Sequence, residues 1–184
     1  QALTEGYELH YKWIYENLWE ELPEEECKKV LATMKEFGLE RGKNNLRVYL
    51  MCEIPSNIIL AEQFLEHVDG YSIGTNDLTQ TTLGISRDDA GKFLDDYIDN
   101  NIFPIDPFVS IDVNGVGQLI GFACENAKKN KPKIKLGICG EHGGDPDSIK
   151  FCQKAGLDYV SCSPYRVPIA RLSAAQAKIL SKRK

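Results

Sequence analysis

IKLGICGEHGGDPDSIKFCQKAGLDYVS, residues 134–161, is the stretch that decides the fold class. A short apolar run, Ile134–Ile138, is followed by an Asp-Pro helix-start signal and a helical pattern over Asp147–Ala155. A second short apolar run, Asp158–Ser161, comes after the helix. Short apolar runs bounded by glycine or polar residues are typical of buried parallel strands, so these residues predict a strand–helix–strand unit.

The same alternation extends outward over most of the chain. Two more apolar runs precede this unit, Leu46–Cys52 and Gly70–Ile73, and each predicts a strand. The remaining predicted helices are Glu24–Phe37, Ile58–Val68, Val116–Lys129 and Ile169–Leu180. Strands that alternate with helices indicate βα units and a parallel sheet, an α/β fold. Four such units amount to half of a (β/α)₈ TIM barrel, which takes about 250 residues. The chain is therefore either an open sheet or the C-terminal half of a barrel.

One connection, Gly84–Ser110, is long and polar. It contains a Ser-Arg-Asp-Asp cluster and an Asp-Asp pair, followed by two prolines. Long connections that follow a strand are often functional loops, so we expect one here.

The first 23 residues differ from the rest of the chain. Tyr7, Tyr11, Tyr15 and Trp19 recur every fourth residue, which predicts one aromatic stripe on a helix. That stripe either packs on its own domain or forms an oligomer contact. We therefore divide the chain into an N-terminal aromatic helical segment, residues 1–23, and a βα domain, residues 24–184.

The composition is that of a soluble globular protein, with 42% hydrophobic and 27% charged residues among 184. The formal net charge of −5 argues against a nucleic-acid surface, which needs clustered Lys and Arg. No apolar run approaches the ~20 residues of a membrane helix, and Gln1–Leu22 lacks the pattern of a signal peptide. The six cysteines show no CxxC spacing, which excludes a compact zinc motif and favours a reducing cytoplasm.

Two carboxylates stand near the ends of neighbouring predicted strands. Glu53 follows the first strand, and Asp77 comes a few residues after the second. Parallel strands bring their carboxyl ends to one edge of a sheet, where α/β enzymes place their sites. Mg²⁺ is typically held by one or two protein carboxylates with water and substrate oxygens, so both residues are candidate Mg²⁺ ligands. The alternative is that Glu53 caps the following helix and Asp77 forms an Asx-turn.

The third predicted strand ends near a thiol, Cys139. Gly137 and Gly140 flank it, so a ligand can reach the sulfur. A thiol with a pKa of about 8.5, which neighbours can lower, suits proton transfer at carbon near neutral pH. The alternative is a buried structural thiol. Two nearby features also have two interpretations: the glycine pair 143–144 is either part of a site or only a tight turn, and His142 is either a catalytic base or a hydrogen-bonded structural residue.

Four long blocks of sequence carry most of these candidates. They are MCEIPSNIILAEQF (51–64), GYSIGTNDLTQTTLGISRDDAGKF (70–93), GICGEHGGDPDSIKFC (137–152) and YVSCSPYRVPIARLSAAQA (159–177). In this order they resemble the C-terminal phosphoenolpyruvate/pyruvate-binding barrel of phosphoenolpyruvate synthase and pyruvate phosphate dikinase, which is related to enzyme I of the sugar phosphotransferase system. The resemblance implies that residues 24–184 are the C-terminal part of such a (β/α)₈ barrel.

The resemblance also implies a role for each candidate. Glu53 and Asp77 resemble the Mg²⁺ ligands, and Asn76 resembles a donor to the substrate phosphate or carboxylate. Cys139 resembles the acid/base that moves a proton at the methyl or methylene carbon of pyruvate or phosphoenolpyruvate. The implied substrate-binding set is Ser72, Gly74, Thr75, Asn76, Asp77 and Glu53.

The implied function is Mg²⁺-assisted phosphoryl transfer from a phosphohistidine to the enolate of pyruvate. The resemblance also implies a phosphohistidine domain in the same parent chain and a homo-oligomer formed through the barrel domain. The block MCEIPSN resembles the synthase (pyruvate, water dikinase), which we favour, whereas SRDDAGKF and GICGEHGGDP resemble the dikinase. The family's substrate-binding arginines lie on earlier strands, so this chain alone is not expected to catalyse the overall reaction. A different Mg²⁺-dependent 2-oxo acid lyase and a non-catalytic assembly fragment are the other interpretations.

Overall fold

The computed structural model describes residues 23–182, which fall into two compact units. The first unit ends at Leu46, and the second begins at Arg47. The predicted aromatic stripe lies within residues 1–22, outside the described residues. In the part of the chain that is described, no helix is both long enough and apolar enough to cross a membrane.

The described part of the first unit is a helix followed by a turn. The helix α2 (Pro23–Glu36) confirms the predicted helix Glu24–Phe37, shifted by one residue at each end. Gly38 (φ 78°) ends it in the left-handed conformation that glycine adopts without strain. A short 3₁₀ segment, η1 (Lys43–Asn45), follows.

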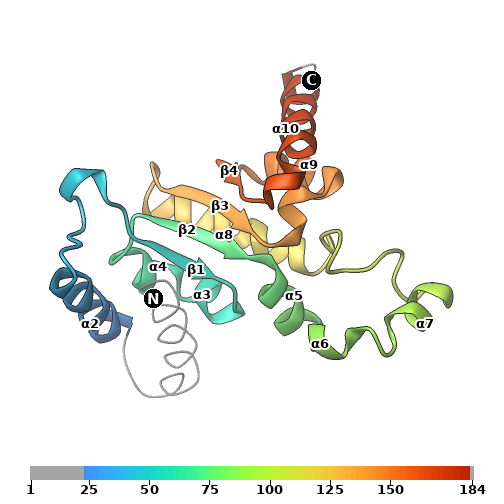
Figure 1. The fold of residues 1–184 in the computed structure, drawn as a ribbon, viewed down its shortest axis with the longest axis horizontal. Helices are drawn as coiled ribbons and strands as arrows, with labels where there is room; N and C mark the ends of the chain where they lie inside the picture. The colour runs from blue at the N-terminus through green and yellow to red at the C-terminus, as the bar shows by residue number, and fades with distance from the viewer. Residues whose placement is uncertain (1–22, 183–184) are drawn as a thin grey trace. The chain divides into compact units, whose positions relative to one another are not determined.

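The second unit is built on four parallel strands (Figure 1). Their order in the sheet is their order in the sequence. The strands are β1 (Tyr49–Cys52), β2 (Gly70–Gly74), β3 (Lys135–Cys139) and β4 (Tyr159–Val160). The predicted α/β fold with four parallel strands is confirmed. The half-barrel stays a prediction, since four such strands fit both an open sheet and part of a barrel.

Two aspartates bond to the strands beside them. Asp69, just before β2, accepts the backbone N–H of Val48 at 2.9 Å, and its own backbone N–H donates to the Val48 carbonyl oxygen at 2.7 Å. Asp158, just before β4, makes the same two contacts with Leu136 of β3, at 3.0 Å and 2.7 Å. The observed β1 and β4 are shorter than the predicted strands Leu46–Cys52 and Asp158–Ser161.

The two faces of the sheet have different side chains. One face is fully buried in the core and carries Cys52, Tyr71, Ile73, Leu136 and Ile138. The opposite face carries glycines under tyrosine rings: Tyr49 lies over Gly70, and Tyr159 lies over Gly137. A Cβ atom at Gly137 would lie 2.3 Å from the Tyr159 ring, so only glycine fits there. The half-exposed tyrosines and glycines make this second face open and lightly packed.

Helices cover the buried face of the sheet. The longest of them there, α8 (Val116–Asn130), packs against α3 (Pro55–Ile59) and α4 (Ala61–Leu65) and lies along the sheet in Figure 1. The predicted helix Ile58–Val68 is wrong as a single helix, because Leu60 (φ −95°, ψ 24°) leaves the helical conformation and divides it. Two more helices of this unit, α9 (Pro146–Ala155) and α10 (Val167–Lys182), pack on each other.

A further helix, α5 (Thr75–Leu83), follows β2 directly, at a place where no helix is predicted from the sequence. Its threonine-rich sequence has weak helix propensity, so the local pattern gives no signal for it. Burial of Leu78 and Thr79 against the core stabilises it in place of propensity.

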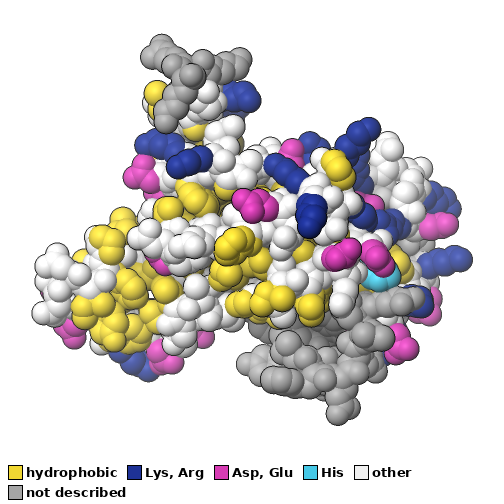
Figure 2. Space-filling view, turned by 180° about the vertical axis from the view of Figure 1, so that it is seen from behind, with side chains coloured by type: hydrophobic (Ala, Val, Ile, Leu, Met, Phe, Trp, Pro, Cys, Tyr) yellow, Lys and Arg dark blue, Asp and Glu magenta, His cyan; other side chains and the backbone are white. Residues whose placement is uncertain are grey.

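The insertion 84–110 is not a plain polar loop. It contains two short helices, α6 (Arg87–Ala90) and α7 (Leu94–Asp99), and a small apolar core of its own around Phe108. Figure 2 shows hydrophobic side chains gathered over this part of the chain. Those of the insertion that are most exposed are Tyr97, Ile102, Ile105 and Val109.

Candidate active site

Three of the predicted residues meet at the carboxyl edge of the sheet. Glu53 directly follows β1, Asp77 lies in the first turn of α5 after β2, and Cys139 is the last residue of β3. The strand register pairs Gly74 with Cys139, which places the thiol beside the junction of β2 and α5. The two carboxylates also act on the pKa of Cys139 through their charge, so all three groups are neighbours.

The carboxyl groups of Glu53 and Asp77 are neighbours, close enough for Glu53 to act on the pKa of Asp77. The Glu53 side chain passes over Gly74. A Cβ atom at position 74 would lie 2.6 Å from Glu53 Oε2, so the absence of a side chain there leaves room for Glu53 to approach Asp77. Burial raises the pKa of Asp77 above its usual value, and the charge of Glu53 raises it further. Gln80 opposes the shift, because its Nε2 donates to Asp77 Oδ1 at 2.9 Å. Two half-buried carboxylates in contact repel each other, and a bound cation relieves that repulsion.

The donor chemistry of this pair fits the predicted Mg²⁺. Carboxylate oxygens are hard ligands, and Mg²⁺ is commonly held by one or two of them together with water and substrate oxygens. Within residues 23–182 no group of three or more His, Cys, Asp or Glu side chains is arranged to hold a metal. Glu53 and Asp77 would therefore bind the ion together with water and substrate oxygens.

The thiol of Cys139 is half-buried among polar and sulfur atoms. Its Sγ lies 3.1 Å from Met51 Sδ and 3.6 Å from the carbonyl oxygen of Ile73. Burial raises the pKa of Cys139, a hydrogen bond with the Ser72 hydroxyl lowers it, and the two nearby carboxylates raise it further. The net shift is upward, opposite to the lowering that a thiolate base needs. A thiol that keeps its proton at neutral pH suits the role of proton donor.

Asn76 is held by protein groups at the start of α5. Its Nδ2 donates to Glu141 Oε2 at 2.5 Å, and Glu141 Oε1 pairs with Arg87 Nη2 at 3.1 Å. The hydrogen bond from Asn76, with the Arg87 contacts, lowers the pKa of Glu141 despite its partial burial. Asn76 Oδ1 is buried and has no hydrogen-bond partner within the described residues. The amide nitrogen carries two hydrogens, so one of them remains for a ligand.

Sequence analysis misses three residues of this network: Gln80, Arg87 and Glu141. The Gln80 side chain connects Asp77 to the start of the insertion. Its Oε1 accepts the backbone N–H of Arg87 at 2.7 Å, and its Nε2 donates to Asp77 Oδ1. The three-residue spacing of Asp77 and Gln80 is a helix signal, which becomes visible only once α5 is known. The contact of Arg87 with Glu141 joins segments far apart in the sequence and has no local signal.

The remaining predicted residues lie behind or beside the thiol. Thr75 is fully buried, and its Oγ1 lies 3.1 Å from the carbonyl oxygen of Cys139, so its side chain shapes the site from behind. His142 is also fully buried, with both ring nitrogens hydrogen-bonded, which confirms its structural interpretation. The 3₁₀ segment η2 (Glu141–Gly144) passes so close to Ser161 that a Cβ atom on Gly143 would lie 1.8 Å from the Ser161 carbonyl oxygen.

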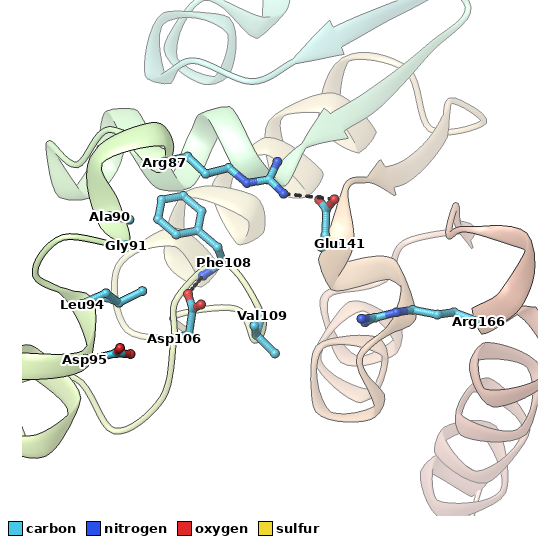
Figure 3. A pocket seen from close by; sticks show the side chains of 10 residues that line it. All are labelled: Arg87, Ala90, Gly91, Leu94, Asp95, Asp106, Phe108, Val109, Glu141 and Arg166. Carbon is cyan, nitrogen blue, oxygen red and sulfur yellow. Dashed lines mark hydrogen bonds and ion pairs between the residues drawn. The ribbon is translucent and has the colours of Figure 1, made fainter.

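A cavity of about 340 Å³ lies between the insertion and the segments that follow β3 and β4. Figure 3 shows Arg87 reaching across from the insertion to Glu141, and Arg166 pointing into the cavity from the other side. Arg166 belongs to a 3₁₀ segment, η3 (Pro164–Arg166). The insertion thus forms one wall of a cavity that shares Arg87 and Glu141 with the strand-end site.

Comparison with known proteins gives a consistent result. A profile for the family described as "PEP-utilising enzyme, PEP-binding domain" matches residues 18–179. Pyruvate, phosphate dikinase of Rhizobium meliloti (strain 1021) is 56% identical over 152 residues, which are 82% of this chain and 17% of that protein. The protein of the same name from Clostridium symbiosum is 50% identical over 154 residues, 83% of this chain and 18% of that protein. The chain therefore spans less than a fifth of the length of these relatives.

Proposed function

Because this chain belongs to the PEP-utilising enzymes, through their PEP-binding domain, we propose that it is the pyruvate- and phosphoenolpyruvate-binding part of a pyruvate, phosphate dikinase. The proposal rests on one observation above all: Cys139 lies beside the Glu53–Asp77 pair at the carboxyl edge of a parallel sheet. That arrangement offers a proton donor and a cation site to one small substrate.

The choice of dikinase over synthase replaces the preference that the sequence block MCEIPSN suggested. Both relatives compared above are named pyruvate, phosphate dikinase, and they match this chain at 56% and 50% identity. The alternative interpretation from the sequence therefore has the better support. Phosphate rather than water would then be the second acceptor in the complete protein.

Each residue at the edge has a distinct task in the proposed reaction. Glu53 and Asp77 are the residues that would hold Mg²⁺, which when bound supplies positive charge to the enolate oxygen of pyruvate. Asn76 has an amide hydrogen left to donate to a carboxylate or phosphate oxygen of the substrate. The backbone N–H groups in the first turn of α5 point out of its N-terminal end, where the helix dipole is positive. Both favour binding of a substrate anion there.

Cys139 moves the proton at the substrate carbon. In the direction that forms pyruvate, the bond between enol oxygen and phosphorus breaks as the phosphoryl group passes to the histidine of another domain. The methylene carbon of the enolate then takes the proton of the thiol, and water returns a proton to the sulfur. The raised pKa of Cys139 supports this direction, because the thiol holds its proton until a stronger base, the enolate carbon, is presented.

The test uses the full-length protein that contains this chain. Incubated with pyruvate and Mg²⁺ in D₂O, it should exchange the methyl protons of pyruvate, a reaction that ¹H NMR follows directly. Cys139→Ala should reduce the exchange rate by about 10²–10⁴-fold, while phosphorylation of the histidine by ATP continues. Cys162→Ala, at a half-buried thiol just after β4, is the matched control and should exchange like wild type.

Loss of both half-reactions in Cys139→Ala would show that the thiol is structural. A second assay separates the two acceptors in the full-length protein. Pyrophosphate that forms from ATP only when phosphate is added supports the dikinase, whereas phosphate release without added phosphate supports the synthase. Turnover of a 2-oxo acid without any phosphohistidine would favour the lyase interpretation instead.

A further inference from the structure

His142 joins three segments that are far apart in the sequence. Its side chain is fully buried within η2, the segment after β3. Nδ1 lies 2.7 Å from Thr75 Oγ1 at the start of α5, and Nε2 lies 2.8 Å from the carbonyl oxygen of Pro107 in the insertion. Thr75 is fully buried as well, so water cannot replace these contacts.

The partners of His142 determine where its ring proton sits. A carbonyl oxygen can only accept a hydrogen bond, so Nε2 must carry a proton toward Pro107. Burial lowers the pKa of His142, although the Pro107 carbonyl and the carboxylates of Asp145, Glu141 and Asp106 oppose this. The neutral ring then has its one proton on Nε2, so Nδ1 can only accept, and it shares the single hydroxyl hydrogen of Thr75 with the carbonyl oxygen of Cys139.

The contacts of Thr75 carry this arrangement to the site. Its Oγ1 is also 3.1 Å from the carbonyl oxygen of Cys139, and a Cβ atom on Gly140 would lie 2.7 Å from it. Gly140 has φ 120°, a conformation that glycine adopts without strain, so the chain can turn directly against the hydroxyl. Thr75 is also the residue from which α5, with Asn76 and Asp77 in its first turn, begins.

We propose that His142 is a positioning residue: it ties Pro107 of the insertion to Thr75 and thereby sets the spacing between Cys139 and the first turn of α5. It touches no reacting atom itself. This inference rests on the proposed function, because that spacing matters only if Cys139 exchanges protons with a substrate held beside Asp77. An apolar residue of similar size would fill the space but leave the Pro107 carbonyl oxygen without this partner and the Thr75 hydroxyl bonded to the Cys139 carbonyl oxygen alone. The insertion would then no longer be tied to the start of α5.

The experiment compares three variants of the full-length protein in the pyruvate proton-exchange assay, at a temperature well below every melting transition. His142→Leu removes both contacts. His142→Asn keeps an acceptor near Thr75, and His142→Gln keeps a donor long enough to approach Pro107. His67→Asn is the matched control, since His67 lies before β2, at the opposite edge of the sheet.

We expect His142→Leu to lower kcat for exchange by about 100-fold, the effect of a misplacement of about 1 Å. KM for pyruvate should change by only a few-fold, and phosphorylation by ATP should be unaffected, because other groups bind those substrates. His142→Gln and His142→Asn should each recover at least about tenfold of the lost kcat, since each keeps one contact. If His142→Leu does not fold, Gln and Asn variants that are slower than wild type in kcat alone support the proposal.

Two results overturn the inference while leaving the proposed function intact. One is wild-type kcat in the variants, and the other is an equal loss in the Leu, Gln and Asn variants, which a merely structural role predicts. A wild-type protein that exchanges no pyruvate protons overturns the proposed function, and this inference with it.

Discussion

Glu53 and Asp77 come from different βα units, yet their carboxyl groups are neighbours, and the Glu53 side chain reaches Asp77 by passing over Gly74. Each is partly buried, and their charges add to the effect of burial, which raises the pKa of the nearby thiol Cys139. Two like charges at this separation are unfavourable without a cation, so a Mg²⁺ ion held by the pair, as proposed, would stabilise the domain.

Mg²⁺ should therefore stabilise the full-length protein against heat, and Asp77→Asn should remove that effect. At a hundredfold excess over Kd, a ligand that binds only the folded state adds about 2.7 kcal/mol. Differential scanning calorimetry with Mg²⁺ and with EDTA measures the shift in Tm. Asp96→Asn, at an exposed acidic residue of α7, is the control and should show the same Mg²⁺-dependent shift in Tm as wild type. An equal shift in Asp77→Asn and wild type would end the assignment of Asp77 as a ligand.

Asp145 caps α9 and gives a prediction with a defined pH dependence. Its Oδ2 accepts the N–H and hydroxyl of Ser148 at 2.8 Å and 2.6 Å and the hydroxyl of Ser110 at 2.9 Å. Burial alone would raise the pKa of Asp145, but these hydrogen bonds lower it below its usual value of 3.8. A carboxyl group whose pKa is lower in the folded state than in the unfolded state stabilises the fold at pH values above its unfolded-state pKa. That contribution is lost as the pH falls through its folded-state pKa.

Asp145→Ala should therefore lower the free energy of unfolding by about 1 kcal/mol at pH 7, the usual value of a helix N-cap. The difference from wild type should shrink as the pH falls below 3.8. Urea unfolding at a series of pH values checks both points. Asp147→Ala, two residues further on and paired only with Lys150 at the surface, is the control, and its effect should stay small. A deficit that persists unchanged in acid would contradict the role of the Asp145 charge.

The six cysteines should fall into two classes of reactivity. Cys52, Cys124 and Cys152 are buried, and burial raises their pKa values to about 12, about 11 and about 12. Iodoacetamide should leave these three unmodified in the native protein at pH 8 and label all of them in denaturant, as mass spectrometry can count. Cys139 should be labelled in the native state, and pyruvate with Mg²⁺ should slow its labelling. Rapid native labelling of Cys52 would show that the core is not packed as described.

Two glycine substitutions should have opposite effects on stability. Gly143→Ala places a Cβ atom 1.8 Å from the Ser161 carbonyl oxygen, a backbone atom that cannot move aside cheaply, and should destabilise the fold by about 3 kcal/mol or more. Gly121→Ala, inside α8 with no atom within 4 Å of the new Cβ, should stabilise it by about 0.5–1 kcal/mol. Equilibrium unfolding of each variant in urea measures the change in its free energy of unfolding relative to wild type. A neutral Gly143→Ala would mean that η2 is free to move away from β4.

The sequence pattern gives the parallel sheet and the residues at its edge. The four apolar runs and the helices between them are visible as local periodicity, and strands in parallel must end at one edge. Glu53, Asp77 and Cys139 are therefore placed together by connectivity alone. The local pattern misses α5, which the burial of Leu78 stabilises. It also does not show that the helix expected over Ile58–Val68 is divided at Leu60.

The tertiary structure alone decides how these residues behave. The upward shift of the Cys139 pKa depends on burial and on charges from two other βα units, and neither is encoded next to the thiol in the sequence. The hydrogen bonds of Asn76 with Glu141 and of His142 with Pro107 likewise join segments that only the packed sheet brings within reach. Local sequence determined which residues stand at the strand ends, because backbone periodicity is a short-range property. Their protonation and partners were decided by tertiary structure, because desolvation and hydrogen bonding depend on every segment that surrounds them.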